Sequence, residues 1–204
     1  GQQFKVTKLK YYVSNFKLTN VDGSVYTVPQ TECYFLIDES NAASHMPELS
    51  IPEGEYKSLS FVIGVDSLRN TMDVSQRTGS LDVSAAAADM YWSWNSGYIF
   101  FKIDGTSPAI TAMGGVFQYH VGGFGGYSSS TVNNLRTITL DLTGRGTPKV
   151  KSGKETNIHL MVDILKALNG TTNMNFSTVA MAHSPNAGVP VAYNYVNMIS
   201  REHT

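Results

Sequence analysis

Histidine and methionine are the residue types in this sequence with the most distinctive chemistry. His120 ends a strand-like segment just before a glycine-rich stretch, His159 alternates with Met161 in another segment, and His183 follows Met181 by two residues. Cu(I) prefers soft thioether and imidazole ligands, so histidine with a nearby methionine is a chemically suitable pair for copper. The alternative for each histidine is a hydrogen-bonded structural residue, with the methionines as core fillers.

Both tryptophans of the chain stand two residues apart, at Trp92 and Trp94. In an extended segment, residues i and i+2 point to the same face. Three interpretations stay open at this point. The two rings are a core pair under a loop, an aromatic platform for a ligand, or an oxidisable pair beside a metal.

Motifs of common enzyme classes are absent from the sequence. It contains no Gly-x-Ser-x-Gly, His-Glu-x-x-His or Cys-x-x-Cys. The nearest candidates for a catalytic carboxylate pair are Asp66 with Asp73 and Asp82 with Asp89, and glycoside hydrolysis requires such a pair in space. We interpret these aspartates as solvated turn residues and predict a protein that is not an enzyme.

Strand signals dominate the 204 residues, so the elements that must position these side chains are β-strands. Period-two alternation predicts strands at 4–13, 16–18, 25–28, 34–37, 56–65, 98–103, 116–121, 136–142 and 157–163. Short helices are expected at 84–90 and 164–168, and the tail 193–203 fits either a helix or a strand. We predict an all-β fold, a sandwich-like antiparallel domain with a few short helices, spanning residues 1–204 as a single domain.

Composition excludes several classes of protein. Only 15% of residues are charged and the net charge is −1, which disfavours a nucleic-acid partner. No apolar run is long enough for a transmembrane segment. The chain opens with Gly1 rather than Met, which we interpret as the mark of an excised leader. Its one cysteine, Cys33, excludes an internal disulfide and is expected to be an inert core residue.

One ordered set of motifs resembles a known family. The set is Trp-x-Trp-x-x-Gly-Tyr-x-Phe, then Asp-Gly, then a strand that ends in His-x-Gly; its residues are Trp92, Trp94, Gly97, Tyr98, Phe100, Asp104, Gly105, His120 and Gly122. This order is similar to the MbnP-like family of periplasmic copper-binding proteins related to MopE and CorA. The low-charge sequence further resembles Bacteroidetes lipoproteins, which implies a lipid anchor ahead of residue 1.

The resemblance implies a fold, a place and a chemistry. It implies a β-sandwich-like domain in the periplasm or at the cell surface that binds Cu(I). In relatives, a di-haem enzyme oxidises a tryptophan to kynurenine, which binds copper together with histidine. Carried over, Trp92 or Trp94 is the oxidised residue and His120 a ligand, with that enzyme or an outer-membrane transporter as partner.

This chain departs from its relatives in two places, which leaves the second copper ligand unassigned. Many relatives carry a cysteine soon after His-x-Gly, where this chain has glycines, and some have Trp-x-His where it has Trp94. Our first candidate for the second ligand is His183 and our second is His159. The competing function is a non-catalytic cell-surface module whose exposed aromatic residues bind carbohydrate or protein.

Overall fold

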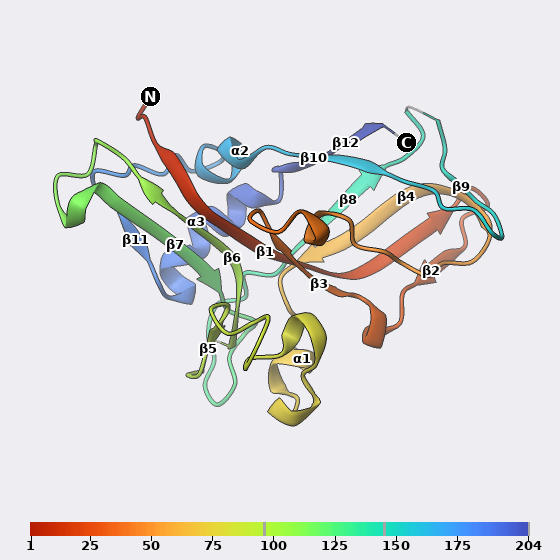
Figure 1. Cartoon of the computed structure of the whole chain (residues 1–204), viewed down its shortest axis with the longest axis horizontal. Helices are drawn as coiled ribbons and strands as arrows, with labels where there is room; N and C mark the ends of the chain where they lie inside the picture. The colour runs from red at the N-terminus through yellow and green to blue at the C-terminus, as the bar shows by residue number, and fades with distance from the viewer. Residues whose placement is uncertain (96, 145, 204) are drawn as a thin grey trace.

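The chain folds mainly into strands, as the alternating sequence predicts. The computed structural model describes residues 1–95, 97–144 and 146–203, with element positions shown in Figure 1. The strands are β1 (Lys5–Asn20), β2 (Val25–Thr27), β3 (Tyr34–Asp38), β4 (Gly54–Ile63), β5 (Tyr91–Trp92), β6 (Gly97–Thr106), β7 (Val116–Gly122), β8 (Arg136–Asp141), β9 (Lys149–Val150), β10 (His159–Val162), β11 (Met181–Ala182) and β12 (Ile199–His203). The helices are α1 (Ser67–Thr71), α2 (Ile164–Leu168) and α3 (Pro185–Tyr195). The prediction of an all-β, largely antiparallel fold with short helices is confirmed.

A large curled sheet runs through the molecule in the order β11-β7-β6-β1-β4-β8. The central strand is β1, which pairs with β6 through residues 5–11 and with β4 through residues 13–20. A bulge at Asn15, where φ is 53°, shifts the register of the β1–β4 pairing between Ser14 and Lys17. Strands β2 and β3 also pair with β1, so this one strand joins the two ends of the sheet.

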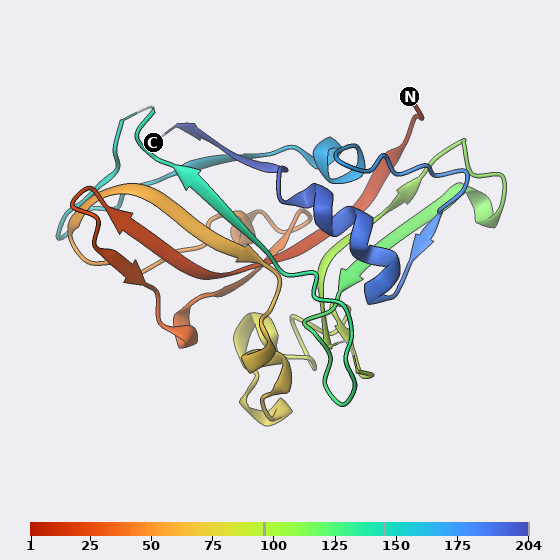
Figure 2. The ribbon, with the colours of Figure 1, turned by 180° about the vertical axis from the view of Figure 1, so that it is seen from behind.

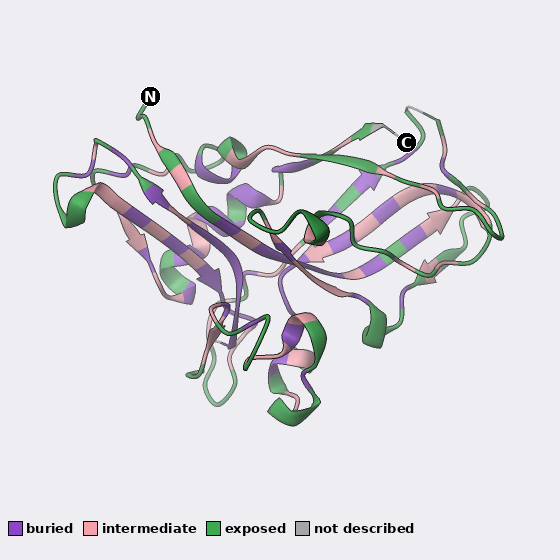
Figure 3. Cartoon of the chain, in the orientation of Figure 1, coloured by how far each residue is buried: buried purple, intermediate pink, exposed green. Residues whose placement is uncertain are grey.

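A second layer covers one face of the sheet and closes the main core. It consists of α2, α3 and the β10–β12 ribbon, which cross behind or above the sheet in Figures 1 and 2. Its buried side chains Ala167, Val191, Tyr195 and Ile199 join the same core as sheet residues such as Phe101. Buried positions are concentrated along β6 and β7 in Figure 3.

A smaller core lies on the opposite face, under the loop that leads to β5. Tyr12, Met90, Tyr98 and Phe100 are fully buried in it. The guanidinium of Arg77 lies 5.6 Å from the centre of the Tyr98 ring, a cation–π contact inside this core. The smaller core therefore fixes the segment that carries both tryptophans.

One expectation about local structure is revised, and one that the sequence left open is resolved. Residues 84–90 form successive turns rather than a helix. The carbonyl of Asp82 accepts from both Ala85 and Ala87, while the Asp82 carboxylate binds Ser84, and these contacts replace a helical ladder. The tail, for which the sequence left two readings, contains both: α3 ends at Tyr195 and β12 follows. Within the described part of the chain, no helix has the length and apolarity to cross a membrane.

Candidate metal centre

His120 lies on the face of β7 that points away from the main core. In this strand Phe117, Tyr119 and Val121 are buried in the main core, so alternation directs Gln118 and His120 to the other face. Two residues further on, Gly122 shares that face with His120. His120 and Gly122 therefore lie next to each other on the face of β7 that points away from the main core.

His183 reaches the same place through a parallel strand pairing. Strand β11 pairs with β7 so that Ala182 lies opposite Tyr119, and both are buried in the main core. His183 follows directly and stacks on His120, with 4.4 Å between ring centroids and 21° between ring planes. The fold therefore brings together two histidines that are 63 positions apart in the sequence.

A buried asparagine holds the two histidine-bearing segments against each other. The Nδ2 amide of Asn134 donates to the carbonyls of Gly122 and Pro185, at 2.8 Å each. These carbonyls lie two residues beyond His120 and His183, respectively. Because Asn134 is 0% exposed, both hydrogen bonds form away from water and fix the spacing of β7 and the start of α3.

Asp104 orients the imidazole of His120. Its Oδ1 lies 2.8 Å from Nε2 of His120, with the two side chains 14% and 13% exposed. A carboxylate can only accept, so Nε2–H is the donor and a neutral ring keeps its lone pair on Nδ1. A carboxylate behind a histidine in this way is the usual outer shell of a metal-ligating imidazole.

His183 is placed where its neutral form is favoured. Burial lowers its pKa below the usual value, and the neighbouring His120 and Lys102 lower it further. Its Nε2 is buried and has no hydrogen-bond partner among the described residues. A neutral imidazole with an unpartnered buried nitrogen suits a metal ion, which requires a lone pair rather than a proton.

Lys102 of β6 lies opposite His120 of β7 in the strand pairing, and its positive charge is neutralised by Asp89. The Lys102 side chain is 9% exposed, and the ammonium group donates to the carbonyl of Asp89 at 2.7 Å and lies 3.4 Å from the Asp89 carboxylate. Lys8 and Lys10 bind the same carboxylate at 3.2 and 3.1 Å. Asp89 therefore lies at the centre of an ion-pair cluster with three lysines.

Trp92 packs over Gly122, next to His120. A Cβ atom added to Gly122 would lie 2.7 Å from Cζ3 of Trp92, so the indole rests directly on the glycine. The rings of Trp92 and Trp94 are 5.3 Å apart and tilted, with Trp94 54% exposed. The His-x-Gly spacing thus has a physical reason: the glycine makes room for the tryptophan on the face that carries the histidine.

The remaining motif positions support this arrangement through backbone geometry and packing. Gly97 has φ of +66°, and a Cβ atom added there would clash with Asn70, whose Oδ1 accepts from the amide of Tyr98. The Tyr98 hydroxyl donates to the Leu81 carbonyl at 2.5 Å. At Gly105 a Cβ would lie 2.2 Å from a carbonyl oxygen of β1. These residues shape the sheet rather than contact the histidine pair.

His159 lies elsewhere. It is in β10, paired with β12 in the separate two-stranded ribbon, and Figures 1 and 2 both show this ribbon well away from β11. Among the described residues, no three or more His, Cys, Asp or Glu side chains form a group that could hold a metal ion. Two imidazoles are thus what the fold assembles from these residue types, and any further donor must be of another kind.

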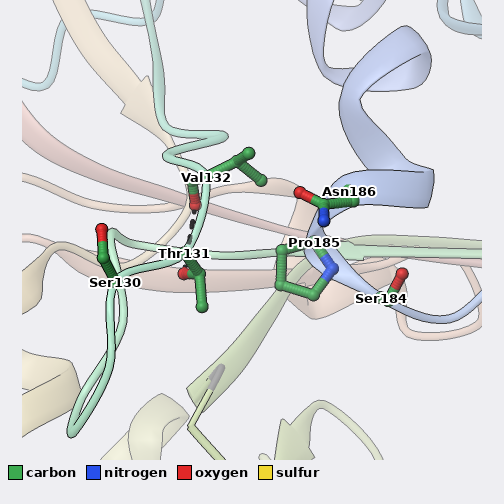
Figure 4. A pocket seen from close by; sticks show the side chains of 6 residues that line it. All are labelled: Ser130, Thr131, Val132, Ser184, Pro185 and Asn186. Carbon is green, nitrogen blue, oxygen red and sulfur yellow. Dashed lines mark hydrogen bonds between the residues drawn. The ribbon is translucent and has the colours of Figure 1, made fainter.

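A shallow hollow of about 440 Å³ adjoins His183 along the chain. Figure 4 shows it between the 130–132 segment and the start of α3, with Ser184 and Pro185 in its wall. Its other lining residues are Ser130, Thr131, Val132 and Asn186, none of them charged. Ser184 caps α3 by accepting from the Ala187 amide, so its position is fixed by the helix.

Sequence reasoning missed the roles of Asp104 and Asn134. Asp104 entered only as a motif position, and its contact with His120 depends on the β6–β7 register, which places Gln118 opposite Asp104. No sequence signal marks Asn134, since its importance comes from burial. His183, our first candidate for a second ligand, is the histidine that the fold stacks on His120.

Comparisons with known proteins agree with this architecture. The family model of MbnP matches residues 1–186. The structure is similar to that of MbnP from Methylosinus trichosporium, with a TM-score of 0.56 and 18% identity over 92% of this chain and 72% of that one. No curated protein matches the sequence. The match over most of its length shows that this chain belongs to the MbnP family.

Proposed function

We propose that this protein binds Cu(I) outside the cytoplasm, with the imidazoles of His120 and His183 as ligands, and that it is not an enzyme. The observation that carries the proposal is the stacked histidine pair with Asp104 hydrogen-bonded behind His120. Membership of the MbnP family supports an extracytoplasmic, copper-associated role. Storage or delivery of copper to an outer-membrane transporter fits such a site, and a lipid anchor ahead of the chain fits that location.

The two rings suit copper chemically, although the stack must open to admit it. A ring nitrogen's lone pair lies in the ring plane, so rings only 21° from parallel direct their lone pairs side by side. Rotation of one ring would bring two nitrogens to one ion. The hydrogen bond to Asp104 holds the ring of His120, so the ring of His183 is the one that turns more easily. Neutral imidazoles without a carboxylate ligand favour Cu(I) over harder cations.

We further propose that Trp92, rather than Trp94, is the residue that a di-haem partner oxidises to kynurenine. Trp92 rests on Gly122 on the face that carries His120, whereas Trp94 is the exposed member of the pair. Ring opening requires an oxidant that the partner must supply. Kynurenine bears an amine and a carbonyl where indole has only an N–H donor, so the change would add donor atoms beside the histidines.

Anaerobic titration with Cu(I) against a competing chelator tests the site. The wild-type protein should bind one Cu(I) ion. His120→Ala and His183→Ala should each weaken binding at least tenfold, because loss of even an outer-shell partner of a ligand costs about 10–100-fold in metal affinity. His45→Ala is the matched control, because His45 lies in an exposed turn beside Glu39. Unchanged affinity in His120→Ala would show that the proposed ligand set is wrong.

A second candidate function has its own supporting observation. Trp94 and Tyr127 are 54% and 53% exposed, and Asn95 holds their segments together by accepting from the Tyr127 amide. Exposed aromatic rings suit stacking on sugar rings or burial against a protein. Titration with oligosaccharides, followed by tryptophan fluorescence, should then give a saturable change that Trp94→Ala abolishes while leaving Cu(I) binding intact.

A further inference from the structure

Met181 lies beside the histidine pair, on the same face of the sheet. In β11 it precedes Ala182, which is 1% exposed and packed in the main core, so alternation directs Met181 to the opposite face. Its register partner in β7 is Gln118, which shares the outer face with His120. The side chain of Met181 is half-buried there rather than extended into solvent.

The spacing permits the thioether to reach an ion held by the two rings. Met181 and His183 are two positions apart, about 6.6 Å along an extended segment, and neighbouring strands lie about 4.8 Å apart. Methionine has three rotatable bonds before its methyl group and adapts readily to nearby shapes. Met181 in β11, His183 directly after β11, and His120 in the paired strand β7 therefore have neighbouring backbone positions on one face of the sheet.

The other donors near the pair are already engaged or unsuitable. The Asp104 carboxylate accepts from His120, and unmodified Trp92 offers an N–H donor without a lone pair for a metal. Among the described residues, no third His, Cys, Asp or Glu completes the group. The thioether of Met181 is the soft donor that remains, and a neutral set of two imidazoles and one thioether favours Cu(I) over Cu(II) or Zn²⁺.

We propose that Met181 is the third ligand of Cu(I) in the unmodified chain, an inference that rests on the proposed copper function. It implies that the protein binds Cu(I) before any oxidation of Trp92. Met181 then determines metal preference, because its removal leaves two imidazoles that also suit Zn²⁺ and Cu(II).

X-ray absorption at the copper edge tests the inference directly. Two protein samples are prepared, one with methionine and one in which selenomethionine replaces methionine, and intact mass confirms that their tryptophans are unmodified. Both samples are loaded with Cu(I) in the absence of oxygen. One sulfur scatterer is expected at about 2.3 Å, a usual metal–sulfur length, and should be replaced by selenium in the labelled protein. Met181→Leu, which conserves volume, should remove that scatterer and weaken Cu(I) binding at least about tenfold.

Met161→Leu is the matched control, since Met161 is 50% exposed in β10 and should leave both readouts unchanged. Copper bound through nitrogen alone, with Met181→Leu binding like wild type, overturns the role of Met181 and leaves the histidine site standing. Failure of the unmodified protein to bind Cu(I) also overturns it. The proposed function is then judged separately, on protein from the native host that carries an oxidised tryptophan, with His120→Ala as the comparison.

Discussion

The contact between Trp92 and Gly122 makes a sharp prediction for Gly122→Ala. The added methyl group would lie 2.6 Å from the carbonyl oxygen of Tyr98 and 2.7 Å from Cζ3 of Trp92. The indole can turn away, but the carbonyl belongs to the backbone of β6, next to β7 in the sheet. The substitution should therefore push the two strands apart locally and lift the indole from the face that carries His120.

The expected cost follows from two opposing effects. Overpacking in a well-packed region destabilises by about 1–3 kcal/mol. Replacing glycine by alanine at a backbone angle that alanine tolerates, as here, restricts the unfolded chain and returns about 0.4–1 kcal/mol. A net loss of about 1–2 kcal/mol corresponds to a fall in Tm of about 2–8 °C for a domain of this size.

Thermal unfolding followed by circular dichroism measures this loss, and tryptophan emission reports the position of the indole. Gly144→Ala is the matched control, since a Cβ there meets nothing within 4 Å. We expect the control to keep the Tm and emission of the wild type, and Gly122→Ala to show a lower Tm with red-shifted emission. If Gly122→Ala also kept both, the seating of Trp92 on this glycine would be refuted.

Three further substitutions follow from contacts described above. Burial alone would raise the pKa of Asp89, but three lysines lower it to about 2, so the stability that this carboxylate contributes is present above pH ~4 and is lost as pH falls through 2. Asp89→Asn should lower the free energy of unfolding by about 1 kcal/mol at pH 7, a figure discounted for the exposure of the side chain. Urea unfolding at several pH values should also show a flatter acid dependence for this variant than for wild type. Asn134→Ala strands two buried carbonyls and should cost about 2–4 kcal/mol by the same assay, a loss under 0.5 kcal/mol contradicting its bridging role. His159→Ala should leave Cu(I) affinity within about twofold of wild type, and a tenfold loss in competition titration would move the site to the β10–β12 ribbon.

Local pattern predicted the strands because it reports burial on two faces. The segment Gly54–Ile63 alternates in sequence, and in the structure Leu59, Phe61 and Ile63 are buried on one face. The long β1 was predicted as two pieces, since the bulge at Asn15 interrupts its alternation. Helix propensity failed at 84–90, where hydrogen bonds to the carbonyl and the carboxylate of Asp82 hold the alanine-rich segment in turns.

The site was predictable only in part because its contacts are set by strand register. Residue chemistry and family resemblance pointed to His120, to His183 and to one of Trp92 and Trp94. The stacking of His183 on His120 depends on a two-residue parallel pairing between β11 and β7, which no local signal encodes. For the same reason the sequence ranked His159 next, although its ribbon lies apart from this edge of the sheet.

Strand β11 lies near the C-terminus but pairs with β7, and this has a consequence for the order in which the chain folds. His120 is joined to its sheet through β6 and β1, but the second imidazole enters only when residues 181–183 dock at the sheet's edge. Near the other end, Gln2 hydrogen-bonds to Asn175 and to the Phe176 amide, so native closure also waits for distant segments. Such long-range closure slows folding. A nascent or translocating chain therefore presents isolated imidazoles, and the paired site arises only with the finished fold.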